Sequence, residues 1–302
     1  MDLSVTIKDC TIKNPVGLAS GTSGYGSEYE SLIPMDVVGC IYTKALTLTP
    51  RPGNDTPRIV ETPSGLLNSI GLANVGVDAF LKEKAPFLRR IKGTTAAFAN
   101  VAGSTPEEYA AVIEKLENAD FLAGYEVNLS CPNVQHGCMA FGTDPNNVES
   151  LVSRLRKLTP KPIIVKLTPN VTDITVIARA AEAGGADAVS CINTLVGMVI
   201  DTEKMRPVFA AGTGGLSGPA IRPVGVAAVY RVSHAIRIPV IGIGGILEWN
   251  DAVQYLLAGA SAVQMGTGIF VDPDSPRKVL SGIAEYAKKA GFSRISDFHG
   301  HF

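Results

Sequence analysis

The stretch PIIVKLTPNVTDITVIARAAEAGGADAVSCI, residues 162–192, contains the unit from which we predict the fold. It begins with a short apolar run, Pro162–Leu167, continues through a segment of helical length and ends in a second apolar run, Ala186–Ile192. Gly184 and Gly185 lie where the predicted helix ends and the chain turns directly into the second run. A strand, a helix and a second strand in this order are typical of a parallel α/β sheet.

The same alternation repeats along the whole chain. We predict eight strands, at Val16–Ala19, Val37–Tyr42, Thr95–Ala99, Tyr125–Val127, Pro162–Leu167, Ala186–Ile192, Pro239–Ile243 and Ser261–Met265. Several are apolar at nearly every position, as strands buried on both faces should be. Their number and the length of 302 residues favour a single (β/α)8 TIM barrel domain over residues 1–302, rather than a doubly wound open sheet. Leu3–Ile12 is predicted to be a hairpin that closes the bottom of the barrel.

Two helices have clear starting signals. Thr105–Glu108 reads Thr-Pro-Glu-Glu, a capping box with proline at the first helical position, and Asp144-Pro145 is a similar start. Apolar residues follow at helical spacing: Tyr109, Val112, Ile113 and Leu116 in the first helix, and Val148, Leu151, Val152 and Leu155 in the second.

The composition excludes several classes of protein. With 27 Lys and Arg against 28 Asp and Glu, the net charge is -1, so nothing favours nucleic acid or a membrane surface as a partner. The five cysteines form no CxxC pair, which argues against a zinc or iron–sulfur site in this chain, and we expect no metal. No signal peptide or membrane span is visible, so we expect a soluble cytoplasmic protein.

Two connections are unusually long for a compact domain. Residues Ala45–Val75 are rich in proline and glycine, and Thr194–Gly218 ends in GTGGLSG. Each follows a predicted strand, so in a barrel both lie at the carboxyl-terminal mouth, where active sites are built. The second segment does not give G-x-G-x-x-G and no strand leads directly into it, which argues against a dinucleotide site there.

Residues that commonly bind ligands lie at the ends of the predicted strands. They are Ser20, Lys44, Asn100, Asn128, Cys131, Lys166, Asn193, Thr194, Gly244, Gly245, Gly266 and Thr267. Asparagine and glycine often end strands, but two lysines and three asparagines on one rim indicate a binding site. The glycines of IGIGGI (Ile241–Ile246) and MGTG (Met265–Gly268) follow the last two strands, where barrels of this architecture commonly bind phosphate.

Cys131 lies in the densest of these clusters, Asn128–Asn133. Three roles are open to its thiol: a buried structural group, a covalent nucleophile or a general base. A protease-like cysteine–histidine pair has little support, because the nearby His136 lies on a glycine-rich loop with no evident orienting acid. A general base would need a substrate with an acidic carbon hydrogen and a hydride acceptor close by.

Three segments together resemble dihydroorotate dehydrogenase. They are TPSGLLNSIGLAN at 62–74, NLSCPNVQHGCMAFG at 128–142 and GLSGPAIRP at 215–223, and the likeness runs over most of the chain. Cysteine at 131, where the membrane-bound class has serine, resembles class 1, and the residues after it resemble the B type. The tail Ser296–Gly300 resembles instead the A type, a homodimer that uses fumarate.

The resemblance implies the reaction, its cofactors and its partners. It implies oxidation of (S)-dihydroorotate to orotate in pyrimidine (UMP) biosynthesis, with Cys131 taking the C5 proton and FMN N5 the hydride from C6. A B-type enzyme passes the electrons to NAD through an electron-transfer subunit that carries FAD and an iron–sulfur cluster, around a homodimeric core within a heterotetramer. The implied flavin contacts are Ser20, Lys44, Ala45, Asn100, Asn128, Lys166, Ile192, Gly218, Gly244, Gly245, Gly266 and Thr267. The implied dihydroorotate contacts are Lys44, Asn68, Ser69, Ile70, Gly71, Leu72, Asn128, Asn133, Asn193 and Thr194.

Three other functions stay open. Another flavin barrel acting on a reduced pyrimidine would share these motifs. A phosphosugar isomerase or lyase would share the glycine-rich phosphate site. A catalytically silent binding subunit would share the fold.

Overall fold

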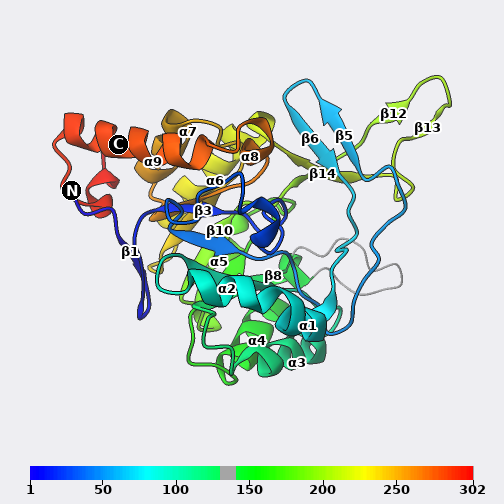
Figure 1. Cartoon of the computed structure of the whole chain (residues 1–302). Helices are drawn as coiled ribbons and strands as arrows, with labels where there is room; N and C mark the ends of the chain where they lie inside the picture. Colours follow the sequence, from blue (N-terminus) through cyan, green and yellow to red (C-terminus); the bar gives the residue numbers. More distant parts are fainter. Residues whose placement is uncertain (130–140, 302) are drawn as a thin grey trace.

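A computed structural model describes residues 1–129 and 141–301. Eight parallel strands close into a barrel in the order β10-β15-β16-β3-β4-β7-β8-β9, with the helices around it (Figure 1). The strands are β3 (Val16–Leu18), β4 (Cys40–Tyr42), β7 (Ala96–Val101), β8 (Gly124–Asn128), β9 (Ile163–Lys166), β10 (Ala188–Cys191), β15 (Val240–Ile243) and β16 (Ala262–Met265). Each overlaps one predicted run. The barrel is therefore confirmed, and the open sheet is excluded.

Except between β3 and β4, helices alternate with the barrel strands as predicted. They are α1 (Gly76–Ala79), α2 (Ala85–Ile91), α3 (Pro106–Leu116), α4 (Pro145–Arg156), α5 (Ile174–Ala183), α6 (Arg222–Ser233), α7 (Trp249–Leu257), α8 (Gly268–Val271) and α9 (Ser275–Ala290). Short turns of helix are η1 (Ser27–Tyr29), η2 (Phe80–Lys84), η3 (Phe141–Thr143), η4 (Pro219–Ile221) and η5 (Ile295–Phe298). The predicted apolar positions of α3 and α4 are all buried.

The predicted caps form with one change. Thr105 Oγ1 accepts a hydrogen bond from the backbone N–H of Glu108 at 3.3 Å, but the Glu108 carboxylate bonds to the N–H of Ser104 rather than that of Thr105. Asp144 Oδ1 accepts from the N–H groups of Asn146 and Asn147 at 2.8 and 3.2 Å. These bonds satisfy donors that a helix start leaves unpaired.

The first βα unit differs from the prediction, because only the short turn η1 lies between β3 and β4. Gly21, Gly24, Gly26 and Pro34 fall in this connection, and these residue types disfavour an α-helix. Helix α9, from the end of the chain, packs against β3 instead.

The predicted amino-terminal hairpin is present as β1 (Val5–Ile7) and β2 (Cys10–Ile12), paired antiparallel. Lys8, at its turn, donates a hydrogen bond to the carbonyl of Pro160 and lies 3.9 Å from the carboxylate of Asp187. Pro160 precedes β9 and Asp187 precedes β10. The hairpin therefore lies at the amino-terminal end of the barrel, as predicted.

The two long connections meet in a second sheet, which we call the arm sheet. It contains β5 (Ile59–Thr62), β6 (Gly65–Asn68), β11 (Leu195–Gly197) and β14 (Gly214–Ser217) in the antiparallel order β11-β14-β6-β5. A smaller pair, β12 (Ile200–Asp201) and β13 (Arg206–Pro207), extends beyond it. Figure 1 shows these strands projecting from one end of the barrel. The sequence prediction contained no strands in these two segments.

The core is formed by the barrel strands and the inward faces of the helices around it. Apolar side chains such as Leu18, Ile41, Val127 and Val165 are fully buried. The two ends of the chain lie together, because the N–H of Asp2 bonds to the carbonyl of Ser293 at 2.8 Å (Figure 1). Within the part of the chain described, none of the helices combines the length and apolarity needed to span a membrane.

Candidate active site

A cavity of about 620 Å³ lies at the carboxyl ends of the barrel strands. Its lining includes residues that end or follow seven of the eight strands. These are Ser20 after β3, Lys44 and Ala45 after β4, Asn128 in β8, Lys166 in β9, Ile192 to Thr194 after β10, Gly244 and Gly245 after β15, and Gly266 and Thr267 after β16. Parallel strands bring these residues together because their carboxyl ends meet at one edge of the barrel.

The arm sheet lines the same cavity on another side. Asn68, Ser69, Ile70, Gly71 and Leu72 contribute from β6 and the residues after it, and Gly214, Gly215, Ser217 and Gly218 from β14 and just beyond it. Asn68 Nδ2 donates to the carbonyl of Gly215 at 3.1 Å, and Asn54 Nδ2 donates to Ser69 Oγ at 2.9 Å. The two long connections therefore build one wall of the site together.

The cavity has a positive lining. Lys44, Arg51 and Lys166 face it, and no described lining residue is acidic. Arg51 was not among the predicted site residues; its Nη2 donates to Ser104 Oγ at 2.7 Å and lies 3.7 Å from the Glu108 carboxylate. Such a lining favours an anionic ligand, because each cation compensates for the loss of water around a phosphate or carboxylate.

The pKa of the Lys44 ammonium is lowered below the ordinary lysine value of 10.5. Burial is the main cause, because it disfavours the charged form; the carboxylate of Glu28 opposes this shift, and the guanidinium of Arg58 adds to it. An anion placed beside Lys44 would raise that pKa again. The charge of Lys44 therefore depends on whether the cavity contains an anion.

A chain of amides crosses the cavity wall between β8 and β10. Asn193 Nδ2 donates to Asn128 Oδ1 at 3.4 Å, and Asn193 Oδ1 accepts from the N–H of Thr194 at 2.8 Å. Tyr109 OH donates to the carbonyl of Asn128 at 2.8 Å, which anchors the end of β8. These amides offer both donors and acceptors to a ligand.

The glycines after β15 have a backbone that other residues rarely adopt. Gly244 has φ +124° and Gly245 has φ +68°, and a Cβ at Gly245 would lie 2.7 Å from the carbonyl oxygen of Gly218. Glycine at both positions allows the backbone to approach a ligand closely. A concave run of main-chain groups of this kind is suited to an anion such as phosphate.

Lys166 forms the floor of the cavity and has a partner that the sequence did not identify. Its Nζ donates to Ser20 Oγ at 3.3 Å and lies 3.7 Å from the carboxylate of Glu126, which is fully buried in β8. In the sequence, the only signal of this partner was Glu126 itself, a charged residue within the otherwise apolar strand β8.

Asn100 is the one predicted contact among the described residues that does not line the cavity. It is fully buried, and its Nδ2 donates to Glu126 Oε2 at 2.6 Å. Its carbonyl oxygen Oδ1 has no hydrogen-bond partner within the described part of the chain. Asn100 therefore lies in the barrel interior with Glu126.

Cys131 and Asn133 lie outside the described residues, so their predicted roles stay predictions. Of the other cysteines, Cys40 and Cys191 are buried, as expected of structural thiols, whereas Cys10 is half-buried. Burial raises the pKa of Cys40 to about 12 and also raises that of Cys191, so neither thiol readily ionises.

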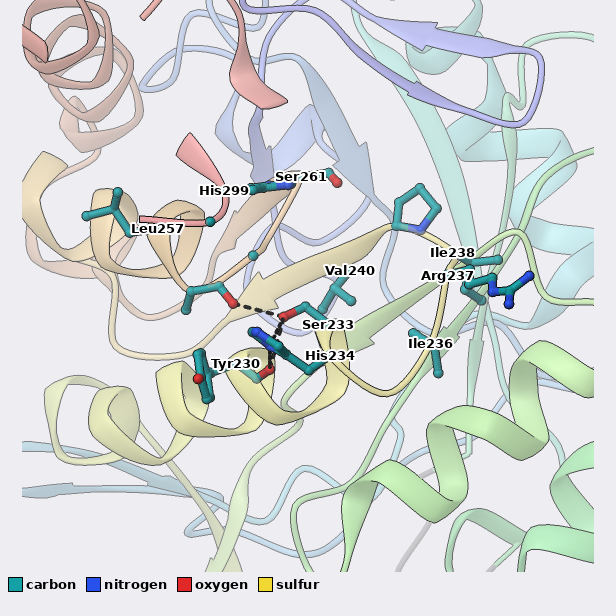
Figure 2. Close-up of a pocket in the computed structure, with 14 residues that line it drawn as sticks. Tyr230, Ser233, His234, Ile236, Arg237, Ile238, Val240, Leu257, Ser261 and His299 are labelled. Atoms are coloured by element: carbon teal, nitrogen blue, oxygen red, sulfur yellow. Dashed lines mark hydrogen bonds between the residues drawn. The ribbon is translucent and has the colours of Figure 1, made fainter. Parts of the chain in front are cut away.

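A second cavity, of about 340 Å³, lies at the opposite end of the barrel near the starts of β15 and β16. Figure 2 shows Ser233 and His234 close together in it, with Arg237 pointing away from them. Ser233 Oγ donates to the carbonyl of Ala258 at 3.0 Å, and His234 Nδ1 lies 2.8 Å from that of Tyr230. Ser233 and His234 thus bond to neighbouring backbone, and Arg237 points away from them, so the mouth cavity is the candidate site.

The chain is also similar in sequence to proteins of a known family. Residues 2–286 match the family model described as dihydroorotate dehydrogenase. Among curated proteins, the chain is similar to the dihydroorotate dehydrogenase B (NAD(+)) catalytic subunits of three bacteria. Identity is 50% for Pelobacter propionicus, 51% for Geotalea daltonii and 49% for Geobacter sulfurreducens, each over 299 residues, which span 99% of this chain and 98%, 97% and 97% of the respective relatives.

Proposed function

The chain belongs to the dihydroorotate dehydrogenase family, and from this premise we propose that it oxidises (S)-dihydroorotate to orotate in pyrimidine biosynthesis, in the cytoplasm. The observation that carries the proposal is the mouth cavity, which presents three cations, no described acidic residue and several amides. The substrate is an anion whose ring alternates N–H and C=O groups. A cationic, amide-rich cavity complements both features.

FMN is the proposed cofactor, and the described residues fit it. Gly218, Gly244, Gly245, Gly266 and Thr267 would hold the phosphate against exposed main chain. The proposed contacts of the remainder of the cofactor are Ser20, Lys44, Ala45, Asn128, Lys166 and Ile192, without Asn100, which does not line the cavity. When bound, FMN would supply the hydride acceptor, which amino-acid side chains do not provide.

The substrate would lie between the arm sheet and the strand ends. Lys44, or a backbone amide in Asn68–Leu72, would bind its carboxylate, and the side-chain amides of Asn68, Asn128, Asn133 and Asn193 would bind the ring. Ser69, Ile70, Gly71, Leu72 and Thr194 complete the proposed contacts. We assign Cys131 as the base that removes the C5 proton, because a cysteine thiol ionises near neutral pH with modest help and its thiolate can then take a proton.

Lys166 would place a positive charge at the floor of the cavity. In this position it would stabilise negative charge that develops on the cofactor when the substrate is oxidised. Its side chain is only 7% exposed, so little solvent would weaken that effect.

The electrons would pass to NAD through a second polypeptide. The catalytic subunits that this chain is similar to are named as NAD(+) enzymes, and this chain has neither an iron–sulfur motif nor a dinucleotide fingerprint. We therefore propose an electron-transfer subunit with FAD and an iron–sulfur cluster, bound around a homodimer of this chain in a heterotetramer.

The test is to purify the chain alone and together with the proposed electron-transfer subunit. We expect yellow protein whose flavin is reduced by dihydroorotate but not by dihydrouracil, and NAD reduction only when the partner is present. Protein that stays colourless after addition of FMN would contradict the proposal. Reduction by dihydrouracil would indicate another pyrimidine-reducing enzyme, and turnover with fumarate by the chain alone would indicate the A-type reaction.

A further inference from the structure

Glu126 lies at the centre of a polar cluster inside the barrel. It is fully buried in β8, and its carboxylate accepts hydrogen bonds from Asn100 Nδ2 at 2.6 Å, Gln264 Nε2 at 2.8 Å and Ser190 Oγ at 3.0 Å. These donors come from β7, β16 and β10. Strand β16 is not a neighbour of β8 in the closed barrel, so the carboxylate points into the barrel interior.

Lys166 joins this cluster to the cavity. Strands β8 and β9 pair in parallel with Glu126 opposite Ile164 and Asn128 opposite Lys166. Side chains two residues apart on a strand share a face, so Lys166 lies one layer above Glu126 toward the mouth. Its Nζ is 3.7 Å from Glu126 Oε2 and 3.3 Å from Ser20 Oγ, and Lys166 and Ser20 both line the cavity.

The surroundings of the Glu126 carboxylate suit a group that only accepts hydrogen bonds. Each of its hydrogen-bonding neighbours donates, and the nearest cation is an ammonium that is itself almost fully buried. A buried ammonium that lacks a nearby carboxylate is costly, because it has lost its hydration. The cluster therefore compensates for the burial of the Lys166 ammonium and fixes its place at the cavity floor.

We propose that Glu126 is a positioning residue that holds the Lys166 ammonium at the cavity floor and directs it toward the ligand. Glu126 does not line the cavity, so it acts through Lys166 rather than by contact. The inference rests on the proposed function for its redox consequence, because the charge of Lys166 would favour the reduced, anionic flavin.

The first test compares the midpoint potential of bound FMN in four variants: Glu126→Gln, Lys166→Met, the double variant and Glu126→Asp. Glutamine has the size of glutamate, and the unpaired Oδ1 of Asn100 can accept from the new amide after rotation of that side chain, so we expect the Gln variant to fold. We expect Glu126→Gln and Lys166→Met both to lower the midpoint potential. The double variant should match Lys166→Met, and Glu126→Asp, which retains the carboxylate, should stay nearer to the unmodified protein.

Three results would overturn the inference. An unchanged potential in Glu126→Gln would show that Lys166 does not depend on the carboxylate. A raised potential would show that Glu126 acts as an opposing negative charge. Additive effects in the double variant would show that the two residues act independently.

The second test needs no flavin. Thermal unfolding of the full-length apoprotein is compared for the same two single variants and the double variant. Removal of one partner leaves the other buried and unpaired, so we expect the double variant to lose less thermal stability than the sum of the single losses. Additive losses would contradict the pairing. If the unmodified protein is not reduced by dihydroorotate, the proposed function fails, whereas this second test still decides whether Glu126 supports Lys166.

Discussion

Asn68 donates a hydrogen bond from Nδ2 to the carbonyl oxygen of Gly215 at 3.1 Å, although 147 residues separate them in the chain. The two residues are also register partners in strands β6 and β14. This contact joins the two long connections into one wall of the candidate site. The wall therefore depends on the close packing of residues around Gly215.

Substitution of Gly215 by alanine should weaken substrate binding. The new Cβ would lie 2.1 Å from Oγ1 and 2.7 Å from Cβ of Thr194, a proposed substrate contact, so Thr194 must move. Overpacking of this kind costs about 1–3 kcal/mol, which corresponds to roughly a 5-fold to 150-fold weaker affinity for orotate. Titration of the protein with orotate measures this affinity. Gly197→Ala, in the same sheet but with its nearest contact at 3.5 Å, is the matched control and should bind orotate normally.

Substitution of Cys131 by serine should leave FMN binding normal and slow flavin reduction by dihydroorotate. A hydroxyl is a far weaker base than a thiolate, and the loss of a positioned base typically slows a reaction by about 10²–10⁴-fold. Stopped-flow absorbance of the flavin at neutral pH measures the rate. Cys40→Ala, which removes a buried thiol, should retain the rate, and an unchanged rate in Cys131→Ser would remove Cys131 from the mechanism.

The affinity for orotate should fall at high pH through Lys44. Its pKa in the free protein is lowered by burial, and the carboxylate of the ligand favours the charged form. Affinity should therefore be constant below the lowered pKa and decrease as the pH rises through it. Isothermal titration at several pH values tests this. Lys44→Arg keeps its charge over the whole range and should remove the decrease; the same decrease in this variant would exclude Lys44 as its source.

Substitution of Gly245 by alanine should weaken FMN binding. Its φ of +68° is strained for alanine, and the added Cβ would meet the Gly218 carbonyl and the Arg222 side chain, both at 2.7 Å. The combined strain is about 1–3 kcal/mol or more, enough for roughly a 10-fold rise in Kd, which flavin fluorescence quenching would report. Gly291→Ala has the same backbone strain at φ +76° with nothing near its Cβ, and it should bind FMN normally. Equal loss in both variants would indicate general destabilisation instead of a phosphate cradle.

The sequence by itself determined the barrel and the positions of most of the candidate residues. Alternation of apolar runs with helical segments is local, and so are the caps at Thr105 and Asp144, because each bond joins residues only a few positions apart. Once the strands were parallel, the residues after them had to share one rim. Lys44, Asn128 and Lys166 were therefore placed correctly at the mouth without any long-range information.

Only the tertiary structure decided which distant residues pair. The arm sheet joins segments far apart in sequence, and its register depends on backbone hydrogen bonds whose partners no local pattern identifies. Similarly, the sequence shows Glu126 only as a charged residue within an apolar strand. In the closed barrel, Asn100, Ser190 and Gln264 from three other strands donate hydrogen bonds to it. A buried charge is tolerated only where the complete fold supplies its partners. The pattern of residues along the chain does not show which strands the closed barrel brings together.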